Sequence, residues 1–134
     1  MTHSAQVELV RAIIAAYNAR DVDSFVELHA PEIEIRQAPG FPESRPLRGR
    51  DDLPNWTVDH FGSFARIRWD TAEICAVSAD RVMHSGDWGG EGAASGVAAG
   101  TSLTGLFTIR AGQVAEVEFY FDHAEALEAA SPAG

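Results

Sequence analysis

The stretch that decides the fold is residues 101–129, TSLTGLFTIRAGQVAEVEFYFDHAEALEA. It holds two β-patterned runs, Thr101–Arg110 and Gln113–Asp122, joined by a two-residue Ala-Gly connection and followed by a brief helical tail. Apolar and polar residues alternate from Val117 to Phe121, which is the period-2 signal of a strand with two different faces. The stretch therefore predicts paired antiparallel strands with one face turned toward a core.

Helical patterns dominate the first part of the chain, and strands follow. Ser4 is the expected N-cap of the first helix, Asp21 or Asp23 that of the second, and Pro31 ends the second helix. A proline- and glycine-rich loop is expected over 38–49, and a wide glycine-rich hairpin connection over 89–100. The expected order is helix, helix, strand, helix and four strands, over residues 6–18, 24–29, 32–37, 51 onward, 67–78, 81–88, 101–110 and 113–122. This order predicts an α+β fold in which the N-terminal helices pack on one face of a curved antiparallel sheet and leave a pocket between them.

Length and composition fit one folded domain, 1–134. The chain has 134 residues, 46% of them hydrophobic and 22% charged, which is typical of a soluble globular protein. The formal net charge is −10, and all ten basic residues are arginines. Without a lysine, the chain has no Schiff-base lysine, no phosphate-loop lysine and no lysine general base.

The same composition also limits which partners and which cellular location are expected. An acidic chain without a basic face is a poor match for nucleic acid. There is no apolar run long enough to cross a bilayer, and MTHSAQVELV lacks the regions of a signal peptide. The single cysteine, Cys75, has no internal partner and is expected to be an inert, buried thiol. We therefore expect a cytoplasmic protein that acts on neither nucleic acid nor membranes.

Three runs of the sequence carry a family resemblance: YNARDVDSFVELHAPEIEI (17–35), PGFPESRPLRGRDDL (39–53) and GLFTIRAGQVAEVEFYFDHAEALEAA (105–130). Together they resemble the SnoaL-like group of the nuclear transport factor 2-like superfamily. The resemblance implies a cone, in which a bent sheet wraps a long helix and a cavity lies at the open end. Relatives include ketosteroid isomerases, limonene epoxide hydrolases, polyketide cyclases, dehydratases and members that only bind or dimerise, so the fold alone assigns no activity.

The catalytic positions of two such relatives can be compared with this chain. The isomerase-like tyrosine, aspartate base and late aspartate fall at or near Ile13, Gln37 and Gly105, and none of these side chains can do that chemistry. The epoxide hydrolase-like pattern needs an arginine two residues from an aspartate on the middle strand, whereas residues 84–88 read HSGDW. On the last strand, Phe119 stands at the inward position where an aspartate is required. Neither reaction is expected by these routes.

If the protein is an enzyme, His60 and Asp122 are its candidate catalytic residues. An imidazole titrates near neutrality and suits proton transfer, and on the third helix His60 would face a ligand beside Trp56. The alternative is a half-exposed histidine at the helix edge. Asp122 ends the last strand, on the opposite parity to Phe119. Among the other histidines, His29 is expected to close the second helix in a structural role.

Aromatic side chains supply the expected ligand surface. Trp56, Phe107 and Phe119 are expected to border a cavity for a small hydrophobic, ring-containing molecule, or else simply to fill the core. Tyr17, Gln37 and Asp87 are expected to add polar contacts. The five histidines have no partners at metal-ligand spacing, so neither a metal nor a cofactor is expected.

Two functions remain open from the sequence. The first is a small-molecule-binding protein with an apolar cavity, to which cofactor-free acid–base chemistry (isomerase, cyclase or hydrolase) could be added. The alternative is a non-catalytic ligand-binding or dimerisation module. A homodimer is expected through the outer face of the last strand, which carries Glu116, Glu118 and Tyr120, with the two acids meeting arginines such as Arg66 or Arg68 of the second copy.

Overall fold

The computed structural model describes residues 2–37, 46–92 and 101–130, and within them all side chains except those of 63–66, 90–92 and 101. The helices are α1 (His3–Ala19), α2 (Val22–Glu27), α3 (Leu53–Ser63) and α4 (His123–Ala130), and a 3₁₀ turn, η1 (Arg50–Asp52), leads into α3. The strands are β1 (His29–Arg36), β2 (Leu47–Arg48), β3 (Phe64–Trp69), β4 (Glu73–Ala76), β5 (Arg81–Gly92), β6 (Thr101–Arg110) and β7 (Gln113–Tyr120).

All the strands belong to one sheet, in the order β2-β1-β7-β6-β5-β3, with β4 paired to β5 beyond the end of β3. The strands β5, β6 and β7 form an antiparallel meander. The predicted α+β class with a curved sheet over N-terminal helices is confirmed. One pairing differs, because β1 runs parallel to β7 and the sheet is therefore mixed. These two strands are far apart in sequence, so no tight turn forces them to be antiparallel.

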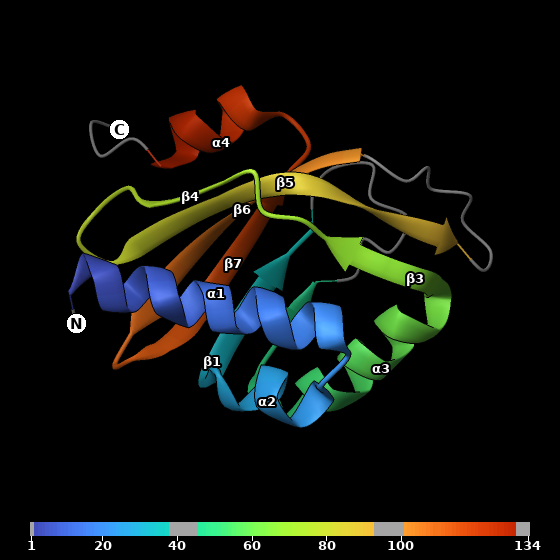
Figure 1. Ribbon diagram of the computed structural model, residues 1–134. Helices are drawn as coiled ribbons and strands as arrows, with labels where there is room; N and C mark the ends of the chain where they lie inside the picture. Colours follow the sequence, from blue (N-terminus) through green and yellow to red (C-terminus); the bar gives the residue numbers. More distant parts are fainter. Residues whose placement is uncertain (1, 38–45, 93–100, 131–134) are drawn as a thin grey trace.

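The helices lie on both faces of the sheet (Figure 1). The long helix α1 lies along the inner face, with α2 and α3 beside it, and α4 lies on the outer face. Strand alternation explains this division. On β5 and β6, Val82 and Phe107 join the inner core around α1, whereas their neighbours Met83 and Leu106 pack against α4.

The hairpin of β6 and β7 closes as the sequence predicts. Ala111 and Gly112 have φ angles of 52° and 78°, and Arg110 pairs with Gln113 across them. Two successive residues at positive φ form the turn whose twist matches that of the flanking strands. The hairpin fixes which face of β7 is buried: Val117 turns inward, and its neighbours Glu116 and Glu118 are only partly covered.

The strand predicted over 67–78 is wrong as a single element, because the chain leaves the sheet between β3 and β4. The Asp70 amide donates to the Asp87 carbonyl (2.9 Å) and the Ala72 amide to the Ser85 carbonyl (2.8 Å), so this bend crosses β5 at Gly86. A Cβ on Gly86 would overlap the Asp70 carbonyl oxygen. Glycine at this position leaves room for the bend to cross β5, the strand with which both β3 and β4 pair.

Several predicted boundaries also move. The N-cap of α1 is Thr2, whose hydroxyl accepts from the Ala5 amide (3.0 Å), and not Ser4. Asp21 caps α2 as predicted, but α2 ends at Glu27, and β1 already begins at His29. Part of the expected 38–49 loop is strand β2, whereas residues 38–45 lie outside the described residues. Strand β5 extends to Gly92, into the expected connection, of which 93–100 are likewise outside.

Candidate functional site

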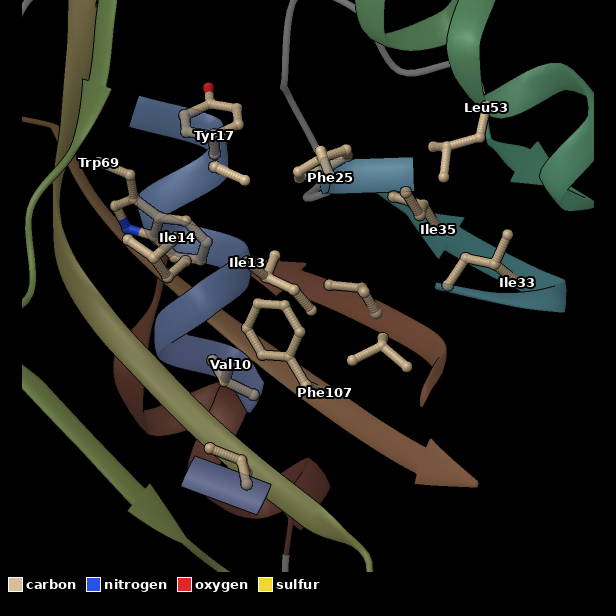
Figure 2. Close-up of a cluster of buried hydrophobic side chains, with 14 of the residues drawn as sticks. Val10, Ile13, Ile14, Tyr17, Phe25, Ile33, Ile35, Leu53, Trp69 and Phe107 are labelled. Atoms are coloured by element: carbon tan, nitrogen blue, oxygen red, sulfur yellow. The ribbon is translucent and has the colours of Figure 1, made fainter. Parts of the chain in front are cut away.

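A recess opens between α1, α3 and the inner face of the sheet; the centre of a water molecule can occupy about 40 Å³ of it, and the space free of protein atoms, open solvent at its mouth included, is about 530 Å³. Figure 2 shows part of its surroundings, with Ile13 and Ile14 of α1 lying among Trp69 and Phe107. Most of the lining is aliphatic or aromatic, and the polar members are tyrosine, histidine and glutamine. The lining residues are Ile13, Ile14, Tyr17, Phe25, His29, Ile35, Gln37, Trp56, His60, Trp69, Trp88, Leu103, Phe107, Val117 and Phe119.

One part of this lining is a buried hydrogen-bond chain from three elements. The indole N–H of Trp88 on β5 donates to the Tyr17 hydroxyl on α1 (2.8 Å). The same hydroxyl lies 2.8 Å from Nε2 of His60 on α3. Tyr17, His60 and Trp88 are 9%, 4% and 2% exposed, so each bond forms away from bulk water. These contacts make a polar centre in an otherwise apolar wall.

The protonation of this centre follows from burial. Burial, followed by the charge of nearby Arg20, lowers the pKa of His60 from 6.5 to about 4, and the imidazole is therefore neutral at pH 7. Burial also raises the pKa of Tyr17, which keeps its proton. Because the Tyr17 oxygen already accepts from Trp88, we assign its proton to the bond with His60 Nε2, which puts the imidazole proton on Nδ1.

Helix spacing brings His60 to this position. Trp56 and His60 are four residues apart on α3 and therefore lie on the same face, where their rings stack at 5.5 Å and 6°. Thr57, also buried, bonds its own helix through the Leu53 carbonyl (2.7 Å). The alternative of a half-exposed histidine at the helix edge is wrong, because the His60 side chain is buried and stacks on Trp56.

His29 is a lining residue that the sequence analysis assigned to a structural role at the end of a helix. It is buried at the start of β1, and its Nδ1 donates to the Phe25 carbonyl (2.6 Å), which leaves Nε2 as an acceptor. Burial lowers its pKa to about 4, opposed by that hydrogen bond and helped by Arg50. Strand parity gives no signal for His29, because Ala30 beside it is also buried, Pro31 is exposed, and the pairing of β1 with β7 shifts register between His29 and Glu34.

The structure brings together most of the residues singled out from the sequence. Among those expected to bind ligand, five line the recess, and the candidate base His60 joins them; the five are Tyr17, Gln37, Trp56, Phe107 and Phe119. Asp87 and Asp122 do not. Asp87 is exposed on β5 between the inward residues Gly86 and Trp88, so strand alternation turns it outward.

Asp122 has a different task. Its carboxylate accepts from the backbone amides of Ala124 (2.8 Å) and Glu125 (3.4 Å), and it therefore caps the start of α4 on the outer side of the sheet. It is exposed and absent from the lining of the recess. We remove Asp122 and Asp87 from the candidate site. The sequence analysis placed Asp122 at the end of the last strand and near the cavity, whereas it is the N-cap of α4.

The site offers little to a metal. Within 2–37, 46–92 and 101–130, no three His, Cys, Asp or Glu side chains gather in a way that could hold a metal ion. Cys75 is half-buried on β4, and burial together with Glu73 raises the pKa of its thiol. No helix among the described residues is long and apolar enough to span a membrane.

Comparison with known proteins identifies relatives of the whole domain. A family model described as SnoaL-like domain matches residues 10–117. No curated protein matches the chain. Among solved structures, a nuclear transport factor 2-like protein from Burkholderia pseudomallei superposes with a TM-score of 0.76 at 20% identity, over 96% of this chain and 97% of that one.

Two further solved structures contain small molecules. A ketosteroid isomerase-like fold protein from Catenulispora acidiphila, in complex with trimethylamine, has a TM-score of 0.74 at 15% identity, over 90% of each chain. TerC, co-crystallised with polyporic acid, has a TM-score of 0.72 at 18% identity, over 94% of this chain and 98% of that one. At these identities the likeness concerns the fold.

Proposed function

The chain belongs to the SnoaL-like domain family, and on that premise we propose that it binds a small, neutral, ring-containing molecule in the recess between α1, α3 and the sheet. The observation that carries the proposal is the Tyr17–His60–Trp88 hydrogen-bond chain within a lining of aromatic and aliphatic side chains. Pockets for small molecules commonly have this composition, with a few polar groups that orient the ligand.

The charge of the lining favours a neutral ligand. None of the described residues that line the recess is Asp, Glu, Lys or Arg, and both of its histidines are neutral at pH 7. An ion would lose its hydration without gaining a counter-charge. The charge of Arg20, which lowers the pKa of His60, would also disfavour a cation beside that imidazole.

The polar centre supports a ligand with a hydroxyl or carbonyl group. Nδ1 of His60, which carries the proton in our assignment, can donate a hydrogen bond, and the Tyr17 oxygen has a further lone pair. His29 adds an acceptor at Nε2, and Gln37 offers both kinds of group. A ligand with one such group on a ring could therefore satisfy both its apolar and its polar surface.

Acid–base chemistry on the bound molecule is the second candidate, favoured by the placement of His60 against Tyr17 in the lining. At pH 7, however, a base whose conjugate acid has a pKa of about 4 has little driving force to remove a proton. Tyr17 is a still weaker acid than in water. We therefore rank binding above turnover.

A ligand panel followed by thermal shift and calorimetry tests the proposal. We expect 1-naphthol to raise the melting temperature, and 1-naphthoate and trimethylamine, which are charged at pH 7, to leave it unchanged. The variant His60→Gln should weaken the binding of 1-naphthol more than that of 1-methylnaphthalene, which has no hydroxyl. Asp122→Asn is the matched control and should change the affinity for neither compound. Preference for the anion or the cation would overturn the proposal.

Turnover has a separate readout. Incubation of the protein with a ring ketone that has an exchangeable α-proton, in D₂O, would report proton transfer by NMR. Exchange catalysed by the wild type and lost in His60→Gln would raise the second candidate above the first.

A homodimer and a cytoplasmic location stay predictions. The acids expected at the dimer contact have arginine partners in their own chain: Arg36 lies 3.0 Å from Glu116 and 3.3 Å from Glu118, and Arg110 lies 3.0 Å from Glu116. Arg68 pairs with Asp70 (2.6 Å), and the Arg66 side chain is outside those described. Light scattering at micromolar concentration would decide the oligomeric state.

A further inference from the structure

Trp69 is fixed from several sides where β3 ends. The Asn18 side chain bonds both backbone groups of Trp69, accepting from its amide (2.8 Å) and donating to its carbonyl (2.9 Å). The indole N–H donates to the Leu103 carbonyl on β6 (3.2 Å). The ring of His84 meets the indole edge-on at 4.3 Å and 83°. An indole held in this way cannot swing aside for a ligand without breaking its buried hydrogen bond to Leu103.

Gly105 on β6 leaves room for this indole. Gly105 pairs with His84 on one side and Phe119 on the other, and its inward neighbours along β6 are Leu103 and Phe107. A Cβ on Gly105 would lie 2.8 Å from Cη2 of Trp69 and 2.9 Å from Cε1 of Phe107. Both distances are shorter than side chains tolerate, so the far edge of the indole occupies the space of a side chain at 105.

The indole also forms part of the recess wall. Its ring centre lies 6.3 Å from that of Phe107 and 5.7 Å from that of Phe119, and all three residues line the recess. Any ring that enters must share this space with the Trp69 benzo ring. Because protein interiors do not compress, the volume of that ring is volume denied to the ligand.

We propose that Trp69 sets the largest ring system that the recess admits, and that position 105 is glycine because the Trp69 indole occupies its side-chain space. This inference rests on the proposed binding function and concerns the size of the ligand. Trp69 and Gly105 act as a pair: shortening the first enlarges the recess, and enlarging the second pushes the indole toward the ligand.

Two variants with opposite effects test the pair with phenol, 1-naphthol and 9-phenanthrol as probes. Relative to the wild type, Trp69→Phe should shift the ratio of Kd values for 9-phenanthrol and phenol by about tenfold in favour of the larger ring. Gly105→Ala should shift it toward phenol. An unchanged ratio in both variants would overturn the inference and leave the proposed function standing. If none of the probes bound the wild type or Trp69→Phe, both would fail.

A stability measurement tests the pair without a ligand. Gly105→Ala should lower the melting temperature of the wild type about twice as much as that of Trp69→Phe, because the shorter ring relieves one of the two close contacts. Gly62→Ala is the control, since nothing lies within 4 Å of a Cβ there and alanine in helix α3 should keep or raise the melting temperature in both backgrounds. Equal losses in the two backgrounds would overturn the coupling of Trp69 with Gly105.

Discussion

Replacing Tyr17 by phenylalanine removes one oxygen atom and two buried hydrogen bonds, and it tests the polar centre directly. The hydroxyl accepts from the Trp88 indole and bonds His60 Nε2, both at 2.8 Å. A buried hydrogen bond contributes about 1 kcal/mol net, and a buried group left with its partner removed costs about 1–3 kcal/mol. Since the ring is retained, packing changes little. We expect the free energy of unfolding to fall by about 2–3 kcal/mol.

Urea unfolding followed by tryptophan fluorescence measures this loss, and the second tyrosine of the chain is the matched control. The Tyr120 hydroxyl bonds the Glu118 carboxylate (2.6 Å) on the partly exposed outer face, where water can replace it. Tyr120→Phe should therefore cost less than about 1 kcal/mol. Equal losses for the two variants, or a loss below about 1 kcal/mol for Tyr17→Phe, would refute the reading of this centre as a buried chain of bonds.

Three further predictions concern protonation, backbone clearance and capping. The pKa of His60 is about 4 in the folded protein and 6.5 in the unfolded chain, so between these pH values only the unfolded chain takes up the proton. The free energy of unfolding therefore keeps its full contribution from His60 above pH 6.5 and falls toward pH 4, by up to about 1.4 kcal/mol per pH unit. Urea unfolding at pH 7 and 5 should show a smaller difference for His60→Gln than for the wild type, whereas the exposed control His3→Gln should match the wild type. Gly86→Ala should lower the melting temperature strongly, since its Cβ would overlap the Asp70 carbonyl, whereas Gly62→Ala on helix α3 should not lower it. Similar melting temperatures for the two variants would contradict this clearance. Asp122→Ala should cost about 1 kcal/mol, with most of it restored in Asp122→Asn, and a change in the Kd for 1-naphthol in either variant would return Asp122 to the site.

The fold was largely predictable because its decisive signals are local. Alternation and a tight turn define the hairpin of β6 and β7, and helical spacing defines α1. The break between β3 and β4 was not predictable from residues 67–78, because its cause lies across the sheet at Gly86. The parallel pairing of β1 with β7 is likewise long-range, since paired residues such as Glu34 and Glu116 lie 82 positions apart in the sequence.

The site was predictable to the extent that helix and strand faces are. Tyr17 and His60 were placed by the apolar stripes of α1 and α3, and Phe119 by the alternation of β7. Asp122 was misjudged because a strand end and a helix N-cap look alike in sequence. The role of Trp69 depends on the absence of a side chain at Gly105, and a missing atom leaves no periodic signal.

The alternation of side chains along the strand β7 places its charged residues on the face away from the recess. On β7, Val117 and Phe119 face the recess, while Glu116 and Glu118 lie on the outer face, where Arg36 reaches both. An unpaired carboxylate turned inward would lose its hydration, with no arginine among the described lining residues to compensate. A chain of net charge −10 therefore has a recess whose described lining is neutral. In the proposed function, such a lining would recognise a ligand by shape and by hydrogen bonds. The burial that excludes charge also keeps His60 neutral, which favours the binding of a molecule over the transfer of its proton.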